Sequence, residues 1–215
     1  MSIADYTEDK LVDAVLRHTT TGGGLPTADP YLQLHSGDPG EAGTTNVVSV
    51  ARVQAAFDAS SGGHAQNTAV IDVASMPAVT VMAWSLHDAA GSGLPPTGGN
   101  CLWTGWLSTL GGVAIVKDAA TTDDIYIPDH GLSVDDRIVF EVVEGLSVPA
   151  GITAGTAYFV KTSATDVITV STTSGGATLS ITGDGQTAWR KVVPKTTNLN
   201  DTFEIAAGDL DIYLD

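Results

Sequence analysis

Short runs of alternating apolar and polar residues, each bounded by glycine, proline, asparagine or aspartate, recur along almost the whole chain. In residues 31–35, for example, Leu32 and Leu34 fall on one face and the remaining side chains fall on the other. This period of two is typical of a half-buried strand. The 24 glycines and the low charged fraction of 16% also favour strands and turns over helices. We therefore predict an all-β fold.

The same pattern predicts strands at residues 50–57, 69–73, 79–87, 100–107, 125–127, 137–143, 157–161, 167–171, 178–181, 202–205 and 209–214. Short strands separated by regular turn signals favour an antiparallel sandwich or barrel, and we expect an antiparallel β-sandwich. One short N-terminal helix is predicted over residues 5–18, where Asp5 and Glu8 form a capping-box-like start. Its inward face is predicted to contain Leu11, Ala14, Val15 and His18.

The sequence changes in character after about residue 111, where strand segments become denser and turn signals more frequent. We predict that residues 115–194 form an inserted small β-domain. Residues 1–114 and 195–215 are then expected to form one discontinuous β-sandwich host domain. Such an insertion is physically reasonable, because a loop tip tolerates a folded guest whose ends lie close together.

The chain is strongly acidic, with 25 acidic and 9 basic residues and a formal net charge of −16. Residues 115–194 have a net charge of −5, and the other 135 residues have a net charge of −11. We expect no nucleic-acid partner, because such a surface repels phosphate. No segment approaches the ~18 apolar residues of a membrane span, and the N-terminus lacks a cationic, apolar leader. We therefore expect a soluble protein that is made in the cytoplasm and has no membrane partner.

No catalytic residue is predicted, because nucleophilic catalysis needs a nucleophile beside an oriented base. No Gly-x-Ser-x-Gly motif is present, and the five histidines stand apart: His18, His35, His64, His87 and His130. His35 and His87 lie where a predicted strand meets a turn. That position suits either a ligand-binding imidazole or, as we favour, a half-exposed ring hydrogen-bonded to nearby backbone or carboxylate.

No metal and no cofactor are predicted either. The sequence contains neither the ligand spacing of a zinc site nor an EF-hand loop, and the single Cys101 can form no disulfide within the chain. The acidic residues Asp123, Asp124, Asp135, Asp136, Asp209, Asp211 and Asp215 are interpreted as carboxylates on solvated strand faces. Several chains together could still recruit a divalent cation through them.

Aromatic residues make up only 6% of the chain, fewer than the platforms of a glycosidase cleft require. Trp84, Trp103 and Trp106 are interpreted as core residues. Trp189, beside two basic residues, is predicted to cap the inserted domain or to face a partner. The predicted core of the host domain consists of Leu32, Leu34, Phe57, Trp84, Leu102, Trp103, Phe203 and Ile205.

Several motifs follow one another in a characteristic order. After the short helix come Leu34-His35-Ser36-Gly37-Asp38-Pro39-Gly40, Ala51-Arg52-Val53, Gly99-Asn100-Cys101-Leu102-Trp103 and Asn200-Asp201-Thr202-Phe203. This series resembles a group of small virion proteins of tailed bacteriophages, which are labelled tail fibre or minor structural proteins. The resemblance covers residues 1–114 and 195–215. Residues 115–194, with His130-Gly131-Leu132-Ser133 and Ser174-Gly175-Gly176, are instead similar to a mobile β-module of phage head and tail proteins.

The resemblance implies a non-enzymatic structural component of the virion, exposed on the particle exterior as a tail-associated fibre or a capsid decoration. Its expected partners are copies of itself, contacted through the β-sandwich, and other virion proteins. The alternative is a receptor- or carbohydrate-binding module that binds host cell-surface glycan through residues 115–194. A hydrolase is a third class, and it would show turnover that depends on a single histidine or carboxylate.

Overall fold

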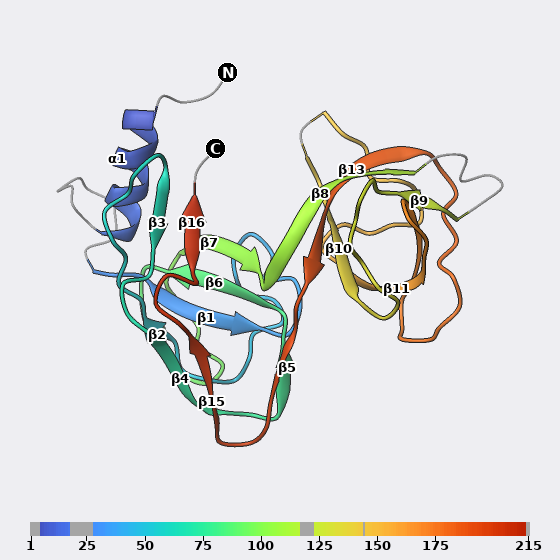
Figure 1. Cartoon of the computed structure of the whole chain (residues 1–215). Helices are drawn as coiled ribbons and strands as arrows, with labels where there is room; N and C mark the ends of the chain where they lie inside the picture. The colour runs from blue at the N-terminus through green and yellow to red at the C-terminus, as the bar shows by residue number, and fades with distance from the viewer. Residues whose placement is uncertain (1–4, 18–27, 117–122, 144, 214–215) are drawn as a thin grey trace. The chain divides into compact units, whose positions relative to one another are not determined.

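The computed structural model describes residues 5–17, 28–116, 123–143 and 145–213 (Figure 1). The chain divides into two compact units. Unit 1 consists of Met1–Gly105 and Lys195–Asp215, and unit 2 consists of Trp106–Pro194. Strands predominate in both units, and every strand pair with a defined register is antiparallel. The prediction of an all-β fold is confirmed.

Unit 1 contains a four-stranded sheet of order β2-β1-β6-β7 and three two-stranded sheets. The larger sheet is formed by β1 (Tyr31–His35), β2 (Val53–Gln54), β6 (Ala83–His87) and β7 (Cys101–Trp106). The smaller sheets join β14 (Lys195–Thr197) to β5 (Val79–Val81), β15 (Asp201–Ile205) to β4 (Ile71–Met76), and β16 (Asp211–Tyr213) to β3 (His64–Gln66). Each smaller sheet therefore combines a strand from before unit 2 with a strand from after it.

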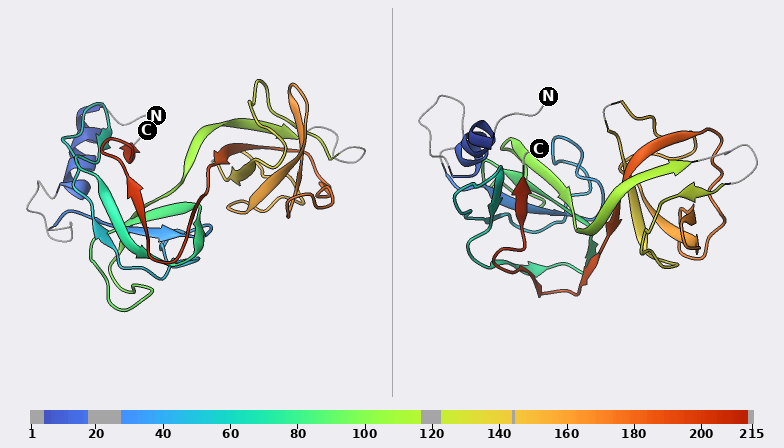
Figure 2. Two further views of the ribbon diagram at one scale, coloured as in Figure 1. Left: turned by 60° about the horizontal axis from the view of Figure 1, so that its bottom comes forward. Right: turned by 45° about the horizontal axis from the view of Figure 1, so that its top comes forward.

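The last strands of the chain are tied to their distant partners by side chains as well as by backbone. The hydroxyl groups of Thr80 on β5 and Thr196 on β14 lie 3.0 Å apart. The buried Asn67 donates to the Ala206 carbonyl at 2.9 Å and accepts from the Leu210 amide at 2.9 Å. In Figures 1 and 2 the red C-terminal strands accordingly run beside the green strands of residues 64–81. Residues 195–215 are thus an integral part of unit 1.

The core of unit 1 contains most of the side chains predicted for it. Buried as predicted are Leu32, Leu34, Phe57, Trp84, Phe203 and Ile205. Leu102, Trp103 and Trp106 are only partly buried, which corrects the prediction. All three lie on β7, the edge strand of the four-stranded sheet, where a side chain has a neighbouring strand on one side only.

The helix α1 (Asp5–Leu16) buries Ala14 as predicted, but the rest of its inward face differs from the prediction. Val12 and Leu16 are fully buried, whereas Leu11 is 45% exposed. The reason is that the inward face also contains a carboxylate: Asp9 accepts a backbone amide of the loop before β3 at 2.7 Å. Apolar spacing alone does not reveal a face that is anchored by a carboxylate. Among the described residues, no helix combines the length and the apolar character needed to cross a membrane.

Unit 2 is a closed six-stranded barrel with the strand order β10-β11-β12-β9-β8-β13. Its strands are β8 (Ser108–Val116), β9 (Ile125–Tyr126), β10 (Arg137–Glu141), β11 (Ala157–Ser163), β12 (Val167–Ser171) and β13 (Gly185–Val192). Closure pairs each strand on both sides, so the barrel satisfies the hydrogen bonds of its own strand edges.

Unit 2 begins at Trp106 rather than at the expected residue 115, because β8 belongs to the barrel. This strand pairs with β13 from Ser108 opposite Val192 to Val116 opposite Gly185. Beyond the ladder, the backbone amide of residue 193 donates to the carbonyl of residue 107 at 2.6 Å. The two ends of unit 2 therefore lie side by side.

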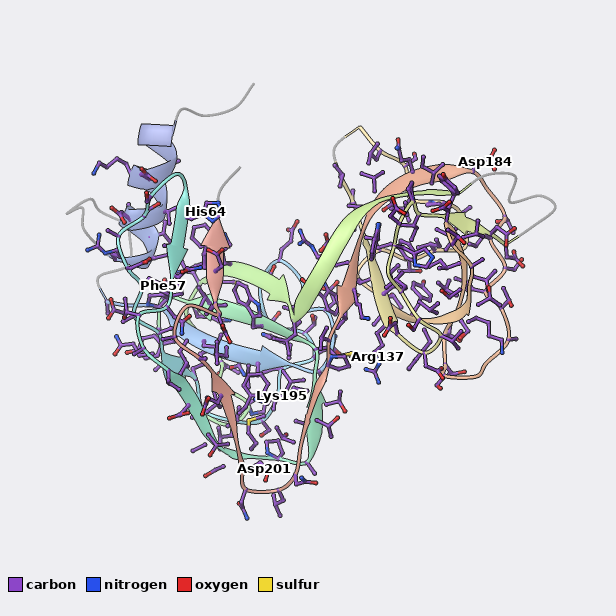
Figure 3. All side chains as sticks on the ribbon, in the orientation of Figure 1. Phe57, His64, Arg137, Asp184, Lys195 and Asp201 are labelled. Carbon is purple, nitrogen blue, oxygen red and sulfur yellow. The ribbon has the colours of Figure 1, made fainter. Side chains whose placement is uncertain are left out.

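Apolar side chains from all six strands fill the interior of the barrel (Figure 3). Trp189 is among them and is only 3% exposed, which corrects the prediction that it caps the domain or faces a partner. In the register of β13, Trp189 lies opposite Phe140 on β10 and Gly112 on β8. Its indole therefore shares the inward face of the barrel, and the basic residues beside it gave a misleading signal.

Candidate functional site

A layer of buried polar side chains lies on one face of β1 and β6. The register of these strands, with Gln33 opposite Ser85 and Tyr31 opposite His87, places Gln33, His35, Ser85 and His87 on the same face. Apart from Tyr31, each of these residues is at most 1% exposed. The leucines on the other face of β1 are buried as well, so this strand is not half-buried as predicted. Its polar face must therefore find hydrogen-bond partners inside the protein.

Ser85 joins two imidazole rings into a hydrogen-bonded chain, here named the His35–Ser85–His87 relay. The Ser85 hydroxyl oxygen lies 2.7 Å from His35 Nε2 and 2.9 Å from His87 Nε2. His35 Nδ1 lies 2.8 Å from the Thr45 carbonyl oxygen. A carbonyl can only accept, so His35 Nδ1 carries a proton and His35 Nε2 accepts from Ser85. Ser85 in turn accepts from His87 Nε2–H.

This chain of donors ends at His87 Nδ1, which is buried and has no hydrogen-bond partner. Because His87 Nε2 carries the proton of the neutral ring, Nδ1 is left as a bare acceptor. Burial, the nearby positive charge of Arg52 and the neighbouring His35 lower the pKa of His87 to about 4. Burial also lowers the pKa of His35. Both rings are therefore neutral at pH 7.

Arg52 lies beside the relay and is 9% exposed. Its Nη1 donates to the carbonyl oxygens of Ala89 at 2.9 Å and Gly98 at 2.8 Å, and its Nε donates to Gln33 Oε1 at 3.3 Å. Carbonyl oxygens therefore solvate this cation in the interior. The same bonds fix the loop between β6 and β7 to β1.

Residues 36–46, here named the cover loop, connect β1 to the segment that leads to β2. The loop holds its own shape, since the Asp38 carbonyl accepts the Thr45 hydroxyl at 2.6 Å and the Asn46 side-chain amide at 2.9 Å. Its hydrogen bond to the relay is the one that the Thr45 carbonyl accepts from His35.

Gly43 brings the cover loop into close approach with the relay. It is buried and has a φ of 60°, a left-handed conformation that favours glycine. A Cβ atom at this position would lie 2.9 Å from both His87 Nε2 and Cys101 Sγ. No larger residue fits without displacing one of these groups. The same enclosure raises the pKa of the Cys101 thiol, because burial disfavours the thiolate.

The relay contains a serine and a base at hydrogen-bonding distance, but it is closed to substrates. Ser85 is fully buried, and its oxygen already accepts from a second histidine. Catalysis at this hydroxyl would require a reactant within reach of it. The part of the chain that the structure describes contains no group of three or more His, Cys, Asp or Glu side chains that could hold a metal ion.

The structure brings His35 and His87 together and leaves the other histidines apart. His64 is exposed on β3 (Figure 3), and His130 is buried in unit 2 with both ring nitrogens hydrogen-bonded to backbone. His18 lies outside the described residues. Rings that were expected to be half-exposed are thus fully buried at the relay, because the cover loop lies over them.

The acidic residues interpreted as solvated include several with defined local partners. Asp136 accepts the Lys191 ammonium group at 2.6 Å, and Asp135 accepts the Ser174 hydroxyl at 2.8 Å. Asp123 accepts a backbone amide at 2.8 Å. Asp215 lies outside the described residues. These bonds place Asp123, Asp135 and Asp136 in local contacts of unit 2.

Sequence reasoning missed Gln33, Ser85 and Arg52 as members of this site. A usable signal was present, because polar residues alternate with large apolar ones in both 31–35 and 83–87. Two strands with this pattern can pair so that their polar positions share one buried face. The pairing itself is not contained in either segment.

Comparison with known proteins identifies the kind of protein that carries this site. Residues 2–134 match a family model described as Podophage GP4 fiber I protein gp80. The chain belongs to this fibre family. Membership confirms the resemblance to phage tail fibre proteins and makes the gp80-family chain a structural protein of a phage virion. The match includes the whole relay and extends past residue 114 into unit 2. No curated protein and no solved structure matches the chain.

Proposed function

We propose that this gp80-family protein is a non-enzymatic component of the virion that is exposed on the exterior of the particle. Family membership supports the structural role. The net charge of −16 is the observation that supports the exterior position, because a surface this acidic is repelled by packaged DNA. A position on a fibre suits the family better than a position on the capsid, and it is the one we propose.

Apolar side chains on the outer wall of the barrel support a contact with a second copy or with another virion protein. Val113 on β8 lies opposite Ala188 on β13, which lies opposite Glu141 on β10. Val142 and Val143 follow directly, and the exposed fractions of Val113, Val142 and Val143 are 47%, 73% and 39%. Three exposed valines, one on β8 and two directly after β10, flank β13 and favour a protein contact over scattered surface exposure.

The closed relay supports the non-enzymatic part of the proposal, because its serine and histidines have no opening to a substrate. Trp189, one of the two features that could support the carbohydrate-binding alternative, lies inside the barrel. Glycan binding by unit 2 would have to use its exposed loops.

Labelling of intact phage particles tests the exterior position. Antibody fragments raised against residues 106–194 should decorate particles that have not been disrupted, as seen by electron microscopy. Labelling that appears only after the particles are opened would contradict the proposal.

The assembly contact is tested by Val142→Lys, with Leu199→Lys, which changes a 71% exposed residue of unit 1, as the matched control. We expect Val142→Lys alone to reduce incorporation into particles or the mass of the purified oligomer, measured by light scattering. Equal effects of both substitutions would argue against the barrel wall as the contact.

A further inference from the structure

Each imidazole ring of the His35–Ser85–His87 relay carries one proton, and a second proton on either ring would leave a buried donor unpaired. A proton added to His87 would sit on Nδ1, a buried atom without a hydrogen-bond acceptor. A proton added to His35 would sit on Nε2, and the Ser85 hydroxyl would then lose the acceptor to which it donates. Either addition leaves a buried donor unpaired beside a new positive charge, which is unfavourable.

The charged and titratable groups around the relay reinforce this effect. Arg52, which precedes β2, faces both imidazoles, and its positive charge opposes a second cation. Asp88, at the end of β6, attracts a proton toward His87, but both of its carboxylate oxygens already accept from residue 100, at 2.7 and 2.6 Å. Asp38 in the cover loop attracts a proton toward His35. On β7, Cys101 is an uncharged thiol at neutral and acidic pH, since its pKa is raised.

The cover loop is the segment that we expect to move when His87 becomes charged. Gly43 lies against the edge of the His87 ring, where a Cβ atom would be 3.0 Å from Cε1, the carbon between the two ring nitrogens. Displacement of Gly43 uncovers the Nε2–Cε1 edge of the ring, so that water can solvate the charge of a protonated His87. The loop also retains its internal bonds from Thr45 and Asn46 to Asp38, so it can move away as one piece.

We propose that the cover loop is an acid-sensitive latch, in which protonation of His87 detaches residues 36–46 from β1 and β6 while both units stay folded. The loop is closed at neutral pH and opens as the pH falls. Opening exposes the buried polar layer and the Cys101 thiol. This inference does not depend on the proposed function.

The size of the effect follows from the pKa of His87, about 4 in the closed state against 6.5 for an ordinary histidine. A closed-state pKa below the open-state pKa means that the open state binds the proton more tightly between these values. The closed state of the cover loop therefore has its full stability above pH 6.5, and it loses stability relative to the open state as the pH falls toward 4. For His87 alone, the equilibrium constant for opening should rise about 30-fold between pH 7.5 and pH 5.

Hydrogen–deuterium exchange of the full-length protein tests the latch. After correction for the intrinsic pH dependence of exchange, peptides covering residues 36–46 should exchange about 30-fold faster at pH 5 than at pH 7.5. Peptides from β1, β6 and the barrel should keep their protection. An unchanged cover loop would refute the proposal, and so would a uniform loss of protection, which indicates global acid unfolding.

His87→Gln is the informative variant, because the glutamine amide can still donate to Ser85 and does not titrate. This variant should lose most of the acid-induced increase in the exchange rate of the cover loop. The matched control is His64→Gln, which changes a ring whose side chain is 52% exposed and should leave the increase intact. If the exchange rate of the cover loop in His87→Gln still rose as much as in the unmodified protein, another group would control the loop.

A titration of the unmodified protein keeps the test independent of how well the variant folds. The amide NMR signals of Gly43 and Thr45 should shift together with the ring signals of His87, with a common midpoint below that of an ordinary histidine. A midpoint near 6.5, or no shift at all, would contradict the latch.

Discussion

Gly105 and Trp84 fit together so closely that their substitutions should not be additive. A Cβ atom at Gly105 would lie 2.6 Å from Trp84 Cε2 and closer still to Cζ2, well inside van der Waals contact. Gly105→Ala should therefore destabilise unit 1 by about 1–3 kcal/mol, the usual cost of overpacking. Trp84 is 9% exposed, so Trp84→Ala should cost about 3–5 kcal/mol.

The double variant decides whether the close approach is the reason for the glycine. Without the indole ring, the alanine methyl group at 105 has space, and alanine in a strand is about 0.5–1 kcal/mol better than glycine. Trp84→Ala with Gly105→Ala should then be no less stable than Trp84→Ala alone. Since the same alanine costs about 1–3 kcal/mol beside the indole and gains about 0.5–1 kcal/mol without it, the interaction free energy from the cycle should be about 1.5–4 kcal/mol in favour of the double variant.

Urea unfolding, followed through the amide NMR signals of β1 and β6, measures the free energy of unfolding of unit 1 without interference from the barrel. Thr104→Ala is the control, because Thr104 is an exposed neighbour on the same strand and its loss should cost less than about 0.5 kcal/mol. Additive effects of the two substitutions would refute the steric explanation for Gly105.

Three further outcomes are expected. Trp189→Ala should destabilise the barrel by about 3–5 kcal/mol, and calorimetry should show a lower Tm for one transition only, whereas an unshifted thermogram would mean that the ring is not in the core. Arg52→Ala leaves three oxygen acceptors without their donor and should cost more than about 2 kcal/mol in urea unfolding, with faster exchange in residues 89–98; unchanged exchange there would contradict its anchoring role. Deletion of residues 106–194, with Gly105 joined to Lys195 by a short Gly/Ser turn, should leave a cooperatively melting unit 1, and a molten product seen by circular dichroism would speak against nested, independently folding domains.

The sequence was sufficient for the fold class because period-two alternation and turn residues are local signals. It identified the segments around β1, β4, β7, β15 and β16, and it placed Phe203 and Ile205 in the core. It did not identify β8 or β13, whose glycines and mixed polar residues give little alternation. These two strands are held by eight paired positions and by closure of the barrel, which are properties of the folded state.

The candidate site could not be predicted from local sequence patterns either, because it also depends on strand pairing in the folded state. His35 and His87 are separated by more than fifty residues and come together only through the pairing of β1 with β6. Their burial then depends on a loop whose close approach is decided by the lack of a side chain at Gly43. Trp189 shows the opposite error, because basic neighbours suggested exposure where strand alternation placed the ring inside.

The pairing of residues 195–215 with β3, β4 and β5 has a consequence for synthesis on the ribosome. The barrel has all of its strands once residue 194 has emerged, whereas unit 1 must wait for partners that lie 116 to 143 positions downstream of Thr80 and Asn67. Long-range pairing of this kind is slow and leaves strand edges uncovered in the meantime. The inserted barrel should thus be the first part of the nascent protein to mature, and its side-by-side ends would shorten the search by which the final strands find their partners.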